Sequence, residues 1–273
     1  MGRFNNFPMT NFAKIPILFE DDSLIVIYKP FGLIVNRAES VKELTIQDWV
    51  EKNYELKITN YEREKDFKDR SGVVHRLDKE TSGCLIIAKN PVSFLILQEL
   101  FKSHQVKKTY IALVHGILIA DSGEINVPIG RLPWNREMHG VIPGGKEAFT
   151  RFKRITNYVM SSGPLRGGPS VASRQELRIK NKQEKFTLVE VNPETGRTHQ
   201  IRVHLKYLGF PIVGDYLYGG RKTQKADRLW CPRVFLHAAK ISFPHPDTRK
   251  EITCQAPIPD DLKLILEKLT PIS

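Results

Sequence analysis

The sequence predicts an α+β fold, in which a mixed, mainly antiparallel β-sheet carries flanking helices. Apolar runs of strand length clearly outnumber helical patterns. Most of these runs follow one another without a helix between them, which favours antiparallel neighbours over parallel crossovers. Hydrophobic residues make up 41% of the 273 residues, enough for a substantial core, and the chain has no internal repeat.

The chain begins with a polar, Asn-rich stretch, residues 1–13, which we predict to be a flexible tail before a single domain over residues 14–273. Residues 15–19 and 24–28 are apolar runs joined by a short acidic link, the pattern of a β-hairpin. The stretch Lys29-Pro30-Phe31-Gly32 then ends the second strand, because Pro fixes one backbone angle and Gly frees another.

Two helices have clear start signals. Thr45 can cap a helix that continues through Asn53. Asn90 and Pro91 are a favoured cap and a favoured first residue, and the residues after them present a broad apolar face. A strand is predicted next, over residues 107–116.

The second half alternates weaker strands with polar segments. We predict strands over residues 124–130 and 148–155, separated by a long loop over 134–145. Residues 161–183 are rich in Gly, Ser, Arg and Lys and predict a flexible basic insertion within the domain. The remaining predicted elements are strands over residues 186–191, 234–243 and 251–256 and helices over residues 198–208 and 259–269.

The composition favours a polyanionic partner. The net charge is +12 and the pI is near 9.6. Residues 161–273 hold 19 Lys or Arg against 11 Asp or Glu, a net of +8, whereas residues 1–60 hold 7 against 8, a net of −1. Three scattered cysteines without a CxxC pair, and no apolar run of membrane-spanning length, predict a cytoplasmic protein without a disulfide or zinc framework.

A polar loop over residues 75–83, HRLDKETSG, lies between two apolar runs. Val73-Val74 is predicted to end one strand, and Cys84 to begin the next. Such loops often carry catalytic groups, because the strands fix them and the loop exposes them. Thr81-Ser82 and Gly83 should stiffen this loop and leave Asp78 at its tip. On pattern alone, an ordinary tight turn with Asp78 as a turn-former fits as well.

A second polar run covers residues 195–205, TGRTHQIRVHL. If it is helical, Thr198 and Arg202 share one face, and we expect Arg202 to point outward. An ordinary charged surface helix fits the same pattern. His199 and His204 are five residues apart and no HExxH motif accompanies them, so we predict no metal site here.

These stretches together resemble the RluA-type family of RNA pseudouridine synthases. The loop HRLDKETSG is similar to the family's catalytic signature, and KPFG, KKTYIALVHG and GRTHQIRVHL followed by GFPIVGDYLYG are similar to further blocks in the same order. The resemblance covers residues 15–260. It implies the pseudouridine synthase catalytic fold, with an active-site cleft across the sheet. Only about a dozen residues precede the first predicted strand, so we expect no N-terminal S4-type domain.

The resemblance also implies roles for single residues. Asp78 is the expected catalytic carboxylate, Arg202 its partner, and Tyr110 the ring that stacks on the target uracil. An arginine beside a carboxylate favours the charged form of the acid and fixes its direction. Further residues are expected to contact the substrate or the RNA: His75, Arg76, Arg197, Lys29, Thr81 and Gln200.

The implied reaction breaks the C1′–N1 glycosidic bond of uridine, turns the base and rejoins it through C5. It contains no redox step, so we expect no cofactor and no metal. The expected partner is RNA, and both ribosomal RNA and transfer RNA are possible substrates. We expect a monomer without an obligatory protein partner. Three chemical roles are open for Asp78: attack at C1′ of the ribose, attack at C6 of the uracil, or removal of a proton from the ribose.

Two other functions compete with this prediction. A non-catalytic RNA-binding protein could retain the synthase fold, although pure binding needs no Asp in a basic site. A glycosidase using Asp78 with Glu80 is a second alternative. Such enzymes need two carboxylates on opposite sides of the bond, and residues two apart in a tight loop are poorly placed for that.

Overall fold

The computed structural model describes residues 14–39, 41–56, 64–160 and 183–272. The chain forms two compact units: unit 1 comprises Met1–Lys107 and Ala238–Pro257, and unit 2 comprises Lys108–His237 and Ile258–Ser273. The predicted tail and residues 161–182 of the predicted insertion lie outside the described residues. No helix in the described ranges is long and apolar enough to cross a membrane.

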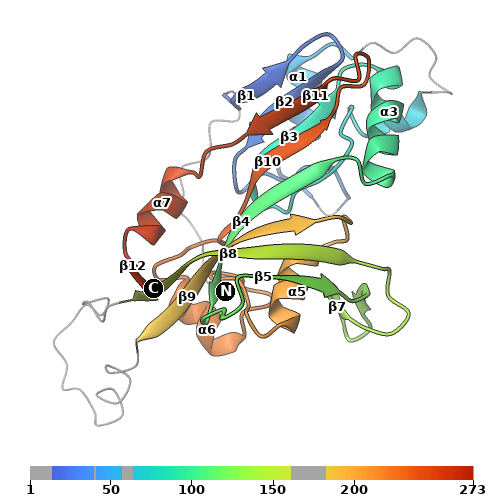
Figure 1. The fold of residues 1–273 in the computed structure, drawn as a ribbon. Coiled ribbons are helices and arrows are strands. Elements are labelled where there is room, and N and C mark those ends of the chain that lie inside the picture. The colour runs from blue at the N-terminus through green and yellow to red at the C-terminus, as the bar shows by residue number, and fades with distance from the viewer. Residues whose placement is uncertain (1–13, 40, 57–63, 161–182, 273) are drawn as a thin grey trace. The chain divides into compact units, whose positions relative to one another are not determined.

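Unit 1 is built on strands in the order β1-β2-β3-β10, with β11 paired to β10 (Figure 1). Their bounds are β1 Ile17–Glu20, β2 Leu24–Lys29, β3 Ser82–Ala88, β10 Leu236–Pro244 and β11 Glu251–Gln255. The pairings of β1 with β2, β2 with β3, and β10 with β11 are antiparallel, which confirms the predicted N-terminal hairpin.

Three helices complete unit 1: α1 Ile46–Asn53, α2 Lys65–Asp69 and α3 Pro91–Lys102. The predicted caps are confirmed, because Thr45 forms a capping box with Asp48 and the Asn90 side chain accepts the Ser93 N–H at 2.9 Å. Helix α3 packs on one face of the sheet through a shared core (Figure 1). That core includes Leu24, Val26, Ile86, Phe94, Leu97, Leu100, Ile241 and Phe243.

Unit 2 has strands in the order β4-β9-β8-β12, with β5 paired to β8, and a separate hairpin of β6 and β7. Their bounds are β4 Lys107–His115, β5 Ser122–Asn126, β6 Ile129–Leu132, β7 Asn135–Val141, β8 Phe149–Met160, β9 Glu184–Pro193 and β12 Thr270–Ile272. The registered pairings are all antiparallel, in agreement with the predicted α+β class.

The helices of unit 2 are α5 Gln200–Tyr207, α6 Arg221–Asp227 and α7 Asp260–Leu266. Helix α5 contributes Ile201 and Leu205 to the core, and α7 contributes Leu262 and Ile265. They pack with residues that are fully buried, namely Leu113, Phe186, Val189 and Val191 from strands and Phe235 just before β10. This core holds β4 and α5, the two elements that carry predicted site residues.

Several sequence predictions were wrong. Val73-Val74 is not a strand, since Val73 forms only an isolated bridge with Ile87. The loop predicted over residues 134–145 contains strand β7, which pairs with β6 in a hairpin. Helix α5 begins at Gln200 and not at residue 198, because His199 adopts a left-handed backbone, φ 56°, just before it. Helices α2 and α6 and strand β12 were not predicted.

Candidate active site

The loop that carries Asp78 is a hydrogen-bonded turn at the start of β3. The Asp78 carbonyl accepts the Thr81 N–H at 3.0 Å, which closes a β-turn over residues 78–81. Leu77, directly before the turn, is buried, and β3 begins directly after it at Ser82. The backbone of Asp78 is therefore fixed on both sides, while its side chain is only half-buried.

Lys29 fastens this turn to the end of β2. Its ammonium donates to the carbonyls of Thr81 at 2.8 Å, Pro30 at 2.9 Å and Lys79 at 3.3 Å, and the Gly32 N–H also donates to Lys79 at 2.7 Å. Lys29 is 0% exposed, and a buried ammonium is tolerated only when it is hydrogen-bonded. The predicted RNA contact of Lys29 is thus replaced by a structural role.

Thr81 and Gly83 are also part of this support. Thr81 is 2% exposed and offers its carbonyl to Lys29, so its predicted contact with RNA does not fit its position. Gly83 has φ +121°, and a Cβ there would lie 2.1 Å from the Ala238 carbonyl oxygen. Only glycine allows the backbone of β3 to approach Ala238 so closely.

His75 and Arg76 precede the turn and differ in exposure. The Ile86 N–H donates to His75 Nε2 at 2.9 Å, so this ring nitrogen carries no proton. The ring also lies 4.6 Å from that of Phe101. These contacts fix the His75 ring against β3 and α3, and its predicted contact with the substrate or RNA stays a prediction. Arg76 is exposed and is accessible for the predicted RNA contact.

Tyr110 lies in β4 of unit 2, opposite Val191 of β9, and its half-buried ring packs against the core. Lys108 is two residues earlier, on the same face of the strand. The Lys108 ammonium donates to the Thr195 carbonyl at 3.1 Å, and burial lowers the pKa of Lys108 to about 8. This contact ties β4 to the turn that precedes α5.

Arg202 extends from α5 into a buried ion pair with Asp215. Its Nε and Nη2 donate to the two carboxylate oxygens of Asp215 at 2.7 and 2.8 Å. The side chains are 5% and 0% exposed, so the expectation that Arg202 points outward was wrong. Asp215 also accepts the N–H groups of Leu217 and Tyr218, and the guanidinium lies 5.0 Å from the Tyr218 ring.

Gln200, the first residue of α5, organises the turn before the helix. Its side-chain oxygen accepts from the Thr195 hydroxyl at 2.7 Å and the Arg197 N–H at 2.9 Å. Its amide donates to the Phe149 carbonyl at 3.0 Å and the Thr150 hydroxyl at 2.9 Å. Gln200 is 4% exposed, so it supports the backbone and does not make the predicted RNA contact. Arg197 is exposed.

The predicted site residues divide between the two units. Unit 1 holds Lys29, His75, Arg76, Asp78 and Thr81, and unit 2 holds Tyr110, Arg197, Gln200 and Arg202. The pairing of Asp78 with Arg202 would join the units and stays a prediction. Sequence reasoning missed Asp215, although an acid between Gly214 and aromatic residues, close after an arginine-bearing helix, was a usable signal.

The family profile described as RNA pseudouridylate synthase matches residues 23–207, well over half of the chain. The chain belongs to the RNA pseudouridylate synthase family. Enzymes of this family are isomerases, and the matched range includes Asp78, Tyr110 and Arg202. Asp215 lies beyond it.

Curated relatives of this synthase cover nearly all of its chain. An uncharacterized RNA pseudouridine synthase of Bacillus subtilis, YlyB, is 34% identical over 256 residues, which are 93% of this chain and 73% of that protein. The ribosomal large subunit pseudouridine synthase D of Buchnera aphidicola is 33% identical over 264 residues, again 93% and 73% of the two chains.

A solved structure resembles the synthase in fold. The human RNA Pseudouridylate Synthase Domain Containing 1 superposes with a TM-score of 0.68 at 23% identity, over 98% of this chain and 92% of that one. At this identity the likeness concerns the fold alone.

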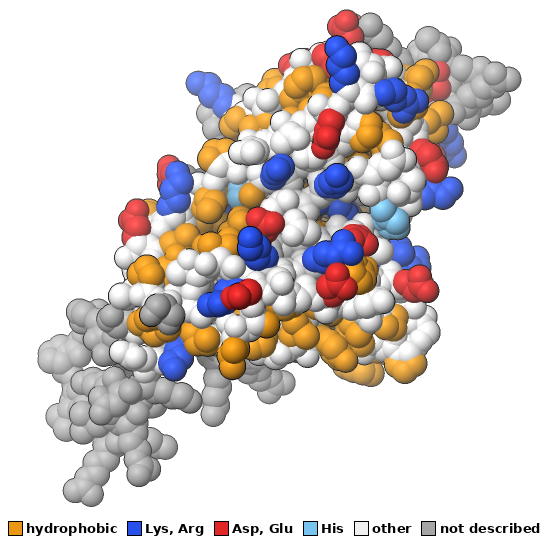
Figure 2. All heavy atoms as spheres, viewed as in Figure 1, with side chains coloured by type: hydrophobic (Ala, Val, Ile, Leu, Met, Phe, Trp, Pro, Cys, Tyr) orange, Lys and Arg blue, Asp and Glu red, His pale blue; other side chains and the backbone are white. Residues whose placement is uncertain are grey.

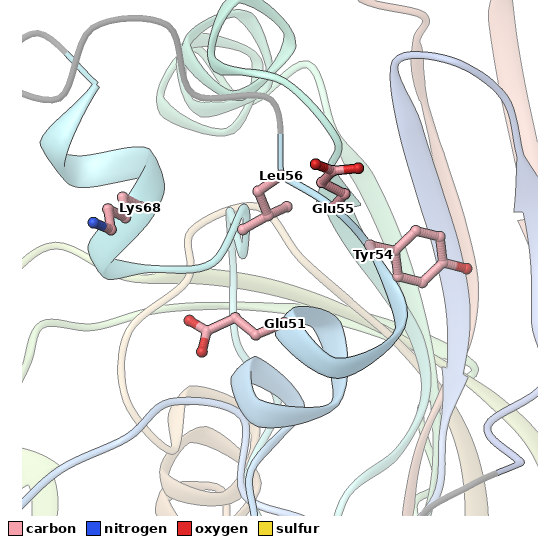
Figure 3. A pocket seen from close by; sticks show the side chains of 5 residues that line it. All are labelled: Glu51, Tyr54, Glu55, Leu56 and Lys68. Atoms are coloured by element: carbon pink, nitrogen blue, oxygen red, sulfur yellow. The ribbon is translucent and has the colours of Figure 1, made fainter.

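Unit 1 of the synthase also has a surface pocket away from the predicted residues. It is lined by Glu51, Tyr54, Glu55, Leu56 and Lys68, from α1, the residues after it and α2 (Figure 3). Glu51 already accepts hydrogen bonds from Arg37 and Ser71. The pocket lining carries two carboxylates and one ammonium, and this net negative charge disfavours the binding of a phosphate. Among the described residues, no cluster of three or more His, Cys, Asp or Glu could hold a metal ion.

Replacing Lys29 by Met should loosen the turn of the synthase that carries Asp78. The carbonyls of Pro30 and Thr81 lose the ammonium as a donor, whereas that of Lys79 keeps the Gly32 N–H, and the free energy of unfolding should fall by about 2 kcal/mol. We expect kcat to fall while the Kd for RNA stays unchanged. Lys79→Met, in the same turn but on an exposed side chain, is the matched control and should change little. A raised Kd with unchanged stability would instead place Lys29 against RNA.

Proposed function

We propose that this enzyme isomerises uridine in ribosomal RNA to pseudouridine, with Asp78 as the catalytic carboxylate. The observation that supports this assignment is the turn itself: a half-buried carboxylate on a backbone held by the Thr81 N–H and by the buried Lys29 ammonium. The named relatives favour ribosomal over transfer RNA. Besides the Buchnera protein, the ribosomal large subunit pseudouridine synthase D of Nitrosomonas europaea is 33% identical over 93% of this chain and 65% of its own.

The chemistry defines what Asp78 must do. The N1–C1′ bond breaks, a C5–C1′ bond forms, a proton leaves C5 and N1 gains one. Asp78 can attack C1′, attack C6 or remove a ribose proton, and each route needs an ionised carboxylate in a fixed direction. Positioning of this kind supplies a large part of enzymatic rate enhancement.

Arg202 and Tyr110 complete the proposed site. The Asp215 carboxylate accepts hydrogen bonds from Nε and Nη2 of Arg202, and these two bonds fix the direction of the guanidinium. We assign this fixed guanidinium as the partner of Asp78. Tyr110 is assigned to stack on the uracil, and stacking on an aromatic ring accepts any flat base.

The target nucleotide must leave its stack to reach such a site, at a cost of a few kcal/mol that is lowest in unpaired RNA. Basic side chains offset this cost by holding phosphates. Figure 2 shows Lys and Arg side chains scattered over one face among acidic ones, without one unbroken basic patch on that face. Exposed Arg76 and Arg197 are our candidates for phosphate contacts near the reacting nucleotide.

The role of Tyr110 can be separated into ring and hydroxyl. If stacking is the main role, Tyr110→Phe should retain most of the turnover, whereas Tyr110→Ala should lose about tenfold or more. Tyr158→Ala is a control, since Tyr158 is also half-buried against the core of unit 2. Single-turnover rates measure the difference. Equal losses in the Phe and Ala variants would assign the function to the hydroxyl.

The proposed substrate is tested by incubating the purified enzyme with unmodified transcripts of large-subunit ribosomal RNA and of transfer RNAs. Mapping of pseudouridine should find one or a few new positions in the ribosomal transcript. Conversion of transfer RNA alone would overturn the ribosomal assignment. Binding without conversion of any transcript would favour the non-catalytic alternative.

A further inference from the structure

Trp134 lies exposed at the turn of the β6–β7 hairpin. Its side chain is 78% exposed, whereas the two other tryptophans of the chain, Trp49 and Trp230, are 3% and 6% exposed. Single exposed aliphatic residues are common, but a fully presented indole ring is unusual because it leaves a large apolar surface in water. Its exposure leaves the ring accessible for stacking on a ligand.

The side chains around Trp134 are basic. Residues 131–136 contain Arg131 and Arg136, both exposed, and no acidic residue. At the base of the hairpin, where the backbones of Lys146 and Ile129 pair, exposed Lys146 is followed by exposed Glu147, so the net positive charge lies in residues 131–136. Glu137 follows the tip as the nearest exposed acid. An exposed aromatic ring close in the chain to cationic side chains is the combination that binds unpaired nucleic acid, by stacking on a base and holding its phosphates.

The hairpin is anchored at its base to the helix that carries Arg202. The Tyr218 hydroxyl accepts the His139 N–H at 3.0 Å and bonds to His199 Nδ1 at 2.9 Å. Tyr218 also packs with Val203 of α5 in a small core. That core further contains Ile129 and Ala148, with Met138, Val141 and Leu217 against it. The hairpin tip is thus held at a defined place relative to Arg202 within unit 2.

We propose that the β6–β7 hairpin is a second RNA-binding element, in which Trp134 stacks on an unpaired base and Arg131 and Arg136 hold neighbouring phosphates. This rests on the proposed function and adds a contact outside the reacting uridine. The ligand is single-stranded or looped RNA, since a duplex offers no open base face. A protein partner is disfavoured, because Trp134 stands alone: in the fully described stretch between Ile119 and Ile155, no other large hydrophobic side chain is exposed to form an apolar interface centre around it.

Tryptophan fluorescence tests this directly, because Trp134 is the exposed indole while Trp49 and Trp230 are buried. The protein is titrated with an RNA hairpin that has a uridine loop and, separately, with a fully paired RNA duplex of equal length. We expect the looped RNA to quench the emission and the duplex to quench it weakly. Trp134→Phe should lose the quenching but keep most of the affinity, and Trp134→Ala should bind the looped RNA about tenfold more weakly.

The contribution of Arg131 and Arg136 is measured by the salt dependence of RNA binding. Arg131→Ala and Arg136→Ala should each reduce the slope of log K against log salt by about one. Leu229→Ala removes an 82% exposed apolar side chain elsewhere in unit 2, and Lys268→Ala removes an exposed cation, so neither should change RNA binding.

Absent quenching, or unchanged affinity of Trp134→Ala for the looped RNA, would overturn the proposal. Equal quenching by duplex and looped RNA would overturn base stacking. The fluorescence signal requires no turnover, so it should persist in Asp78→Asn. Quenching without isomerisation would therefore contradict only the proposed function, and isomerisation without any Trp134 effect would contradict only the hairpin proposal.

Discussion

Asp78→Asn is expected to abolish pseudouridine formation, with a loss of roughly ten-thousandfold or more in the single-turnover rate. The amide has almost the same shape as the carboxylate but cannot act as a nucleophile or base. The turn should stay intact, because its hydrogen bonds use the backbone carbonyls of Asp78, Lys79 and Thr81. RNA binding, measured by titration, should remain nearly unchanged.

Glu80→Gln is the matched control for this variant. Glu80 lies two residues from Asp78 in the same turn, and its replacement removes an equal charge. We expect near-normal turnover, whereas a pair of catalytic carboxylates, as in a glycosidase, would require both acids. Residual turnover of Asp78→Asn within tenfold of the wild type would rule Asp78 out as the catalytic group.

Arg202→Lys is expected to be the next most damaging change. Lysine keeps the charge but cannot make the two-pronged contact that Arg202 makes with Asp215 at 2.7 and 2.8 Å. The 0% exposed Asp215 then loses part of its support, which should lower the free energy of unfolding by about 1–3 kcal/mol. We also expect kcat to fall by on the order of a hundredfold, as for a lost group that stabilises developing charge.

Arg233→Lys separates the catalytic loss from the structural one. Arg233 is 2% exposed and makes the same kind of two-pronged contact, with Asp261, at 2.5 and 3.2 Å. Its replacement should destabilise unit 2 to a similar degree but leave the turnover of the folded enzyme unchanged. If both lysine variants lost stability and turnover in parallel, Arg202 would have only a structural role.

Elements with local signals were predictable from the sequence. Thr45 and Asn90 mark helix starts because their side chains satisfy backbone N–H groups within the next turn. The β1–β2 hairpin was also predictable, since two apolar runs flank a short acidic link. In each case the interactions that define the element lie within a few residues of one another.

Elements that depend on distant partners were not predictable. Strand β12 has three residues and exists through its pairing with β8, more than a hundred positions earlier. Strand β7 was predicted as part of a loop, because its glycine and charged residues interrupt the alternation of apolar side chains. The division into two units has no linker signal, since β10 begins in unit 2 and ends in unit 1.

The same limit applies to the candidate site. The resemblance pointed to Asp78, Tyr110 and Arg202, but Lys29 and Gln200 were interpreted as contacts to the substrate or RNA. Lys29 and Gln200 are buried instead, because backbone groups of the turns at Asp78 and before α5 need hydrogen-bond partners. Asp215 was missed because its pairing with Arg202 becomes visible only when the chain after α5 folds back on the helix.

The most direct test is a pseudouridine map of total RNA from cells that lack this gene, complemented with the wild-type gene or with Asp78→Asn. We predict that one or a few positions in large-subunit ribosomal RNA lose pseudouridine in the deletion strain. Wild-type enzyme should restore them and Asp78→Asn should not. An unchanged map in the deletion strain, or equal restoration by both genes, would contradict the assignment of Asp78 as the catalytic carboxylate of an RNA pseudouridine synthase.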